Sequence, residues 1–142
     1  MTTNDAKQIK TSTKLRVIMK LEEFNVYQMA METGEEVWKI VIKWDYFAKD
    51  TIGKQFVRAI DSVAANLSEG VGRYHYKEAK NFSYYSRGSL FESKTWLTKA
   101  HNRNLIKTED YNRISADLES IGVKINNYIK SIGKIPKPNN NK

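Results

Sequence analysis

One segment near the carboxyl end repeats its apolar side chains at the spacing of a helix that faces other helices. These residues alternate at intervals of three and four, at Tyr111, Ile114, Leu118, Ile121, Ile125, Tyr128 and Ile132. This a/d pattern lines one side of a helix and is typical of the seam of a helical bundle. The pattern therefore predicts an all-α domain in which the stripe faces the chain's own core. A partner helix is the alternative use of the same stripe.

Three further segments have helical spacing, at about residues 21–48, 54–68 and 76–103. We expect a short turn at residues 49–53, where Asp50 or Thr51 could cap the second helix, and Gly70 and Gly72 should end that helix. Four helices with short connections predict an antiparallel up-down-up-down four-helix bundle. We assign residues 15–133 to the bundle, residues 1–14 to a disordered basic arm and residues 134–142 to a disordered tail.

The first expected helix has more apolar surface than one buried face requires. Besides a stripe that begins at Phe24, it has a second stripe made of Val37, Ile40, Trp44 and Phe47. A surface helix of a globular domain needs only one apolar face. The second stripe therefore predicts an interface with another subunit.

The composition argues against several classes of protein. The chain has 142 residues, no cysteine and only two histidines, so it offers no disulfide, no thiolate metal site and no histidine-rich site. No apolar run approaches the roughly 18 residues of a membrane helix, and the first ten residues do not form a secretory signal. We expect a cytoplasmic protein without a membrane segment.

No catalytic arrangement is recognisable in the sequence. The Gly70–Gly72 segment has neither the spacing nor the Lys-Ser/Thr ending of a phosphate-binding loop. Glu69 and Glu92 could be paired carboxylates, but the Glu-x-x-His motifs of di-metal bundles are missing. We therefore expect neither an enzyme nor a bound metal or cofactor.

The net charge of +8 and the pI of about 9.6 favour association with a polyanion. The strongest candidate surface is the start of the third helix with the loop before it. Its residues are Arg73, Tyr74, Lys77, Lys80, Tyr84, Arg87 and Lys94. At a spacing of three and four the cations should line one helical face, where they can neutralise phosphates while the tyrosines stack on bases. The alternative is a solvated basic face whose tyrosines pack at a subunit interface.

A second polar stripe lies on the helix before this surface. Gln55, Arg58, Ser62, Asn66 and Glu69 fall within an arc of roughly 80° at about 100° per residue. Such a stripe predicts hydrogen bonds between helices or subunits that set the register of the bundle, or else direct contact with a ligand. Glu92 on the third helix could pair with Arg58 and help to set this register.

The order of these polar residues resembles a family signature. The pattern Gln55-x-x-Arg58-Ala59, then Ser62, the segment 65–70 and Gly72-Arg73, resembles that of the bacterial four helix bundle proteins. A second signature follows at residues 88–92, with Gly88, Ser89 and Glu92. The family includes proteins encoded by intervening sequences of large-subunit ribosomal RNA genes. It is also similar to the accessory variability proteins of diversity-generating retroelements, and the resemblance covers about residues 21–132.

The resemblance implies a homo-oligomeric ring, typically a pentamer, with a basic surface or pore. It also implies a target of structured RNA, or a reverse-transcriptase complex in the retroelement relatives. Together with the charge, it favours a non-enzymatic oligomer that binds nucleic acid, RNA more than DNA. The alternative is a scaffold that docks an acidic protein partner through its basic face. The sequence leaves open the sequence specificity, the subunit number and the choice between the two kinds of relative.

Overall fold

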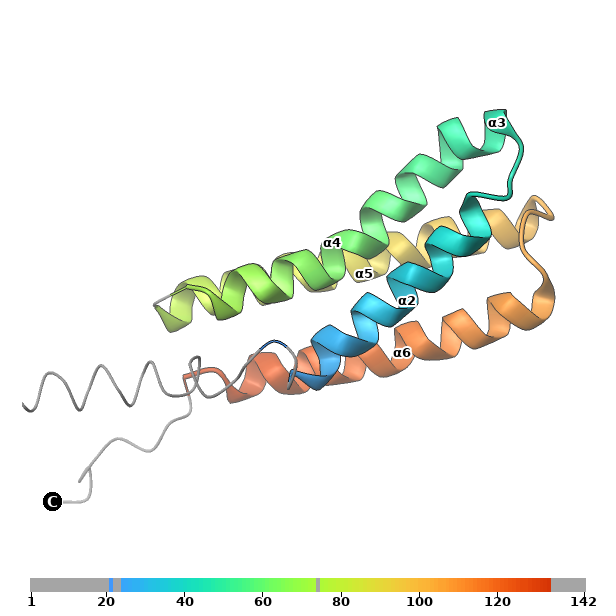
Figure 1. Ribbon diagram of the computed structural model, residues 1–142. Coiled ribbons are helices and arrows are strands. Elements are labelled where there is room, and N and C mark those ends of the chain that lie inside the picture. Colours follow the sequence, from blue (N-terminus) through green and yellow to red (C-terminus); the bar gives the residue numbers. More distant parts are fainter. Residues whose placement is uncertain (1–20, 22–23, 74, 134–142) are drawn as a thin grey trace, which may run out of the picture.

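The computed structural model describes residues 21, 24–73 and 75–133, and all regular structure in these residues is helical (Figure 1). The long helices are α2 (Asn25–Val41), α4 (Lys54–Val71), α5 (Tyr76–Asn102) and α6 (Thr108–Ser131). Two short elements, α3 (Tyr46–Ala48) and the π-helical η2 (Lys49–Gly53), lead directly into α4. The all-α prediction is confirmed for this part of the chain. The arm and the tail expected at residues 1–14 and 134–142 lie outside the described residues.

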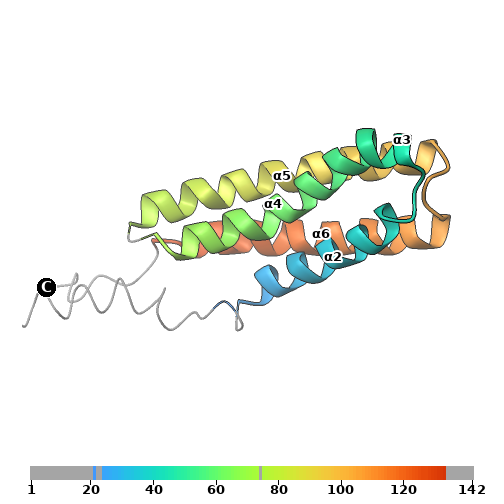
Figure 2. The same ribbon diagram turned by 45° about the horizontal axis from the view of Figure 1, so that its top comes forward.

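The four long helices form a bundle in which each helix lies beside two others (Figures 1 and 2). Phe24, just before α2, has its ring 4.7 Å from that of Tyr128 near the end of α6. Gly70, near the end of α4, lies against Ala79 near the start of α5. The start of α2 thus lies beside the end of α6, and the start of α5 lies beside the end of α4. The two helices of each pair therefore run antiparallel.

The core is filled by the stripe predicted on α6 together with large side chains of α4 and α5. Ile114, Leu118, Ile121 and Ile125 have no exposed surface. The other large side chains that are almost completely buried are Val37, Phe56, Ile60, Val63, Leu67, Leu90 and Leu97. The α6 stripe therefore serves the chain's own core, as expected.

The first helix is shorter than the sequence predicts. It ends at Val41 instead of continuing to residue 48, and the chain turns at residues 42–45. Asp45 begins the next helix, because its Oδ1 accepts a hydrogen bond of 3.0 Å from the backbone N–H of Ala48. The predicted caps Asp50 and Thr51 lie inside the helical rod. The Thr51 hydroxyl instead donates to the carbonyl oxygen of Phe47.

The turn expected at residues 49–53 is a π-helical turn, so the helical path is continuous from Tyr46 to Val71. Gly53 is buried at the junction. A Cβ atom added there would lie 2.8 Å from Val41 Cγ1 and 3.1 Å from the carbonyl oxygen of Ala48. The glycine thus serves a close approach of the end of α2 to this rod. It does not break the helix, and the prediction of a turn was wrong.

Replacing Asp45 with alanine should lower the free energy of unfolding by about 1 kcal/mol, the usual effect of losing an N-cap. The physical reason is the unpaired Ala48 N–H that the substitution leaves at the helix start. Urea unfolding followed by circular dichroism measures the change. Asp50→Ala is the matched control, because it removes only an exposed ion pair with Lys54. Equal losses in the two variants would contradict the assignment of Asp45 as the cap.

Gly70 and Gly72 lie at the predicted end of α4, but neither adopts the left-handed conformation in which a glycine commonly ends a helix. The helix runs through Gly70 to Val71, and Gly72 has a φ of −74°. Gly70 is buried, and a Cβ atom there would lie 3.1 Å from both the Ala79 carbonyl oxygen and Phe82 Cβ. Its role is therefore close packing of α4 on α5.

The second apolar stripe of the first helix does not form one outward face. Val37 is fully buried and Trp44 is 9% exposed, so both belong to the chain's own core. Ile40 packs against that core, and Phe47 alone is well exposed, at 76%. The small residues Ala30, Thr33 and Gly34 share the buried face of α2 with Val26, Val37 and Val41. The larger side chains of Met31, Trp38 and Ile42 are left outside, and they are 42%, 51% and 46% exposed.

Candidate nucleic-acid interface

The predicted basic stripe follows one side of α5. Lys77, Lys80, Tyr84 and Arg87 recur at intervals of three, four and three, so they lie within about a quarter turn of one another. Lys77 and Tyr84 are exposed, and Lys80 and Arg87 are half-buried. From Lys77 to Arg87 the stripe is about 15 Å long, at about 1.5 Å per residue. We call these four residues the α5 basic face.

Contacts with α6 hold one end of this face in place. Arg87 donates a hydrogen bond of 3.0 Å from a guanidinium N–H to Asn126 Oδ1. The same guanidinium lies 5.0 Å from the centroid of the Tyr84 ring, within the range of a cation–π contact. Asn126 is neutral, so this hydrogen bond does not compensate the positive charge of Arg87. Neither Lys77 nor Lys80 forms an ion pair within the described residues, so three cations here have no carboxylate partner.

Lys94, farther along the same side of α5, is neutralised. Its Nζ lies 2.8 Å from Glu119 Oε1 on α6 and 4.9 Å from the centroid of the Phe91 ring. The pairing follows from the register of α5 on α6, which also brings Arg87 to Asn126. The uncompensated charge of the stripe therefore ends at Arg87.

Arg73 does not join the stripe. It lies at the end of α4, where its guanidinium is 3.1 Å from Glu69 Oε2 and 3.4 Å from Glu78 Oε2. The Arg73 Nε–H is buried and is not aligned for a hydrogen bond, so the contact with Glu69 is an ion pair only. The guanidinium also lies 4.8 Å from the Phe82 ring centroid. Arg73 thus ties α4 to the start of α5, and Tyr74 lies outside the described residues.

Sequence reasoning did not identify the contribution of α6. Lys130 is exposed and follows Asn126 by one helical turn on the same side of α6. Because the two helices are antiparallel, Lys130 extends from Asn126 toward the Lys80 end of the α5 basic face. Only the pairing of α5 with α6 places it there, and no local sequence signal does so.

The positive charge of the described residues is modest and local. They contain 16 of the 24 Lys and Arg residues and 13 of the 16 Asp and Glu residues, so +3 of the net charge of +8 belongs to them. At physiological salt, charges interact over about 8 Å. The local arrangement of the cations therefore matters more to this surface than the net charge of the bundle.

Among the described residues, the polar stripe of α4 makes no side-chain hydrogen bond to another helix. Asn66 donates to the Ser62 carbonyl oxygen within α4, and Glu69 pairs with Arg73. Gln55 and Arg58 are exposed and have no side-chain partner among the described residues. Hydrogen bonds from this stripe therefore do not set the register inside one chain.

The expected pair between Arg58 and Glu92 does not form. Glu92 instead accepts a hydrogen bond of 3.1 Å from the indole N–H of Trp96, one turn along α5. A different contact joins α4 and α5 in the core, where the buried Ser86 hydroxyl donates to the Val63 carbonyl oxygen over 2.7 Å. The second signature lies on the same helix, with Gly88 exposed and Ser89 half-buried.

The described residues offer neither a metal centre nor a membrane segment. No group of three or more His, Asp or Glu side chains among them could hold a metal ion. None of their helices is long and apolar enough to cross a bilayer.

Two comparisons relate the chain to known proteins. A family model described as 23S rRNA-intervening sequence protein matches residues 22–127. A crystal structure of a protein of unknown function from the S23 ribosomal protein family of Bacteroides thetaiotaomicron superposes with a TM-score of 0.67 at 20% identity, covering 75% of this chain and 99% of the other. At this identity the superposition shows a shared fold. No curated protein matches the chain.

Proposed function

Because the chain belongs to the 23S rRNA-intervening sequence protein family, we propose that it is a non-enzymatic protein that binds structured RNA through the α5 basic face. The observation that supports this proposal is a set of three cations on one side of α5 that have no carboxylate partner among the described residues and lie on the same side as the exposed ring of Tyr84. Cations at this spacing neutralise phosphates, and an exposed aromatic ring stacks on an unpaired base.

Structured RNA fits this surface better than DNA duplex alone. An RNA with loops presents phosphates beside unstacked bases, which is the combination that Lys77, Lys80 and Tyr84 can contact together. The resemblance to retroelement accessory proteins adds a reverse-transcriptase complex as a candidate partner. A cytoplasmic location agrees with either target.

The proposal is tested by fluorescence anisotropy with a labelled hairpin RNA, a DNA duplex and polyglutamate at low salt. Tighter binding to the hairpin than to the other two polyanions is the expected result. If polyglutamate competes as well as RNA, the scaffold function with an acidic protein partner replaces this proposal. The exposed apolar residues of α2 are the observation that favours such a protein contact.

We further propose that the protein acts as a homo-oligomer. The family resemblance favours a pentamer. The interface that we propose includes Met31 and Trp38 on one side of α2, together with Ile42, the C-cap residue that continues this side. Large exposed apolar side chains grouped on one face are typical of subunit contacts. Several copies would raise the effective affinity of a weak basic face.

Replacing both Trp38 and Ile42 with glutamate should reduce the oligomer to single chains, because the carboxylates would lose hydration in the interface. Light scattering after size-exclusion chromatography measures the mass. Val123→Glu is the control, since Val123 is 59% exposed on α6 and away from this face. An unchanged mass of the double variant, or a monomeric unmodified protein, would refute this interface.

A further inference from the structure

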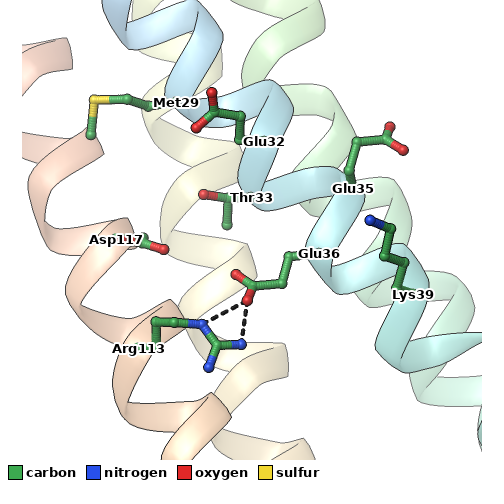
Figure 3. A pocket seen from close by; sticks show the side chains of 8 residues that line it. All are labelled: Met29, Glu32, Thr33, Glu35, Glu36, Lys39, Arg113 and Asp117. Carbon is green, nitrogen blue, oxygen red and sulfur yellow. Dashed lines mark hydrogen bonds and ion pairs between the residues drawn. The ribbon is translucent and has the colours of Figure 1, made fainter.

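The groove between α2 and α6 has more carboxylates than cations, with Glu32, Glu35, Glu36 and Asp117 against Lys39 and Arg113. It forms a cavity of about 570 Å³ lined by Met29, Glu32, Thr33, Glu35, Glu36, Lys39, Arg113 and Asp117. Figure 3 shows Glu32 and Asp117 on opposite walls of this space. Glu36 pairs with Arg113, whose Nε lies 2.7 Å from the carboxylate, whereas Glu32 and Asp117 have no ion-pair partner among the described residues.

A threonine hydroxyl points into the same groove. Thr33 as a whole is only 4% exposed, and its side chain makes no hydrogen bond within the described residues. Its oxygen is not among the fully buried unpaired atoms of these residues, so it opens to the groove. In Figure 3 its oxygen is turned from α2 toward the wall that carries Asp117. A hydroxyl both donates and accepts hydrogen bonds. The Thr33 hydroxyl is therefore available to a ligand in the groove.

The electrostatics of Asp117 favour a cation beside its carboxylate. Burial raises the pKa of its carboxyl, and repulsion by Glu36 and Glu32 raises it further, while Arg113 acts in the opposite direction. These are the charged groups that act on Asp117 from α2 and from its own helix. The ionised carboxylate is thus less stable in the folded chain than in water, and a bound cation would relieve that instability.

We propose that the groove between α2 and α6 binds a linear organic cation that carries primary amines. Its ammonium groups would pair with Glu32 and Asp117 and donate to the Thr33 hydroxyl, while its methylene chain would lie along Met29. The carboxylates are too dispersed for a bare metal ion, whereas a chain with amines at both ends can reach both walls. The same chemistry is found in a free polyamine and in the lysine side chains of a peptide.

The experiment titrates the full chain, without nucleic acid, with spermidine or with a capped trilysine peptide. Calorimetry gives the affinity, and the shift of the Thr33 amide resonance reports the position. Saturable binding of either probe with a shift at Thr33 supports the proposal, and the tighter probe identifies the source of the amine. Absence of binding by both probes at millimolar concentration would overturn it, without bearing on RNA binding by α5.

Asp117→Asn separates binding from folding. It should weaken amine binding at least about tenfold, because one charge-assisted contact is lost. A raised carboxyl pKa means that ionised Asp117 opposes folding at neutral pH, so the variant should be at least as stable as the unmodified chain. Asp61→Asn is the matched control, because burial and Glu35 raise the pKa of Asp61 in a different groove. Equal losses of amine binding in the two variants would refute the site.

Discussion

Replacing Lys77 and Lys80 together with glutamate is expected to weaken the binding of structured RNA about thirtyfold or more at 0.15 M salt. At 0.15 M salt, the counterions released by one phosphate contact raise the binding constant roughly fivefold above its value at 1 M salt. Each lost contact removes this gain. The two new carboxylates add repulsion to this loss. The slope of log K against log salt should also become shallower by about two. Anisotropy titrations across a salt series measure both quantities.

The control variant carries the same change of net charge elsewhere. Lys49 and Lys99 are exposed, and Lys99 lies on α5 about 18 Å beyond Arg87, the last residue of the α5 basic face. Lys49→Glu with Lys99→Glu should leave the salt slope almost unchanged. If both double variants lose affinity equally, net charge explains the binding and the α5 basic face is not the site.

Replacing Phe56 with alanine should lower the free energy of unfolding by about 3–5 kcal/mol, the range for truncating a buried phenylalanine. Phe56 is 1% exposed, and it packs in the core shared by α2, α4, α5 and α6. The loss is large because a domain is stabilised by only about 5–15 kcal/mol in total. Urea unfolding measures it.

Phe47→Ala is the matched control, because it makes the same chemical change at the start of the same continuous rod. Phe47 is 76% exposed, so its truncation should change the free energy of unfolding by about 0.5 kcal/mol or less. The comparison is made at low protein concentration so that any subunit contact of Phe47 does not contribute. A small loss at Phe56 would contradict the core described above.

Patterns that depend on one helix alone could be predicted from the sequence. The regular spacing of Ile114, Leu118, Ile121 and Ile125 specifies both the helix and its buried side. The junction between the first two helices could not be predicted in the same way. Gly53 resembles a helix breaker locally, but its role comes from contact with Val41, which is distant in sequence.

In the candidate site, too, features of one helix could be predicted from the sequence, whereas features that depend on a neighbouring helix could not. The spacing of Lys77, Lys80 and Arg87 places them on one side of a helix whatever surrounds it. Whether a cation is free or paired depends on the neighbouring helix, so the sequence did not reveal that Glu119 neutralises Lys94. The unused carboxylates of Glu32 and Asp117 also become visible only when α2 lies beside α6.

The most direct test of the central claim is the binding of a hairpin RNA by the unmodified protein across a salt series, with the mass measured in the same buffer. The three cations Lys77, Lys80 and Arg87 predict that log K falls linearly with log salt, with a slope of about −2 to −3 for each bound chain. A steeper slope is expected if several chains of an oligomer contact one RNA. Absence of binding at about 50 mM salt, where phosphate contacts are strong, would contradict RNA binding by this protein.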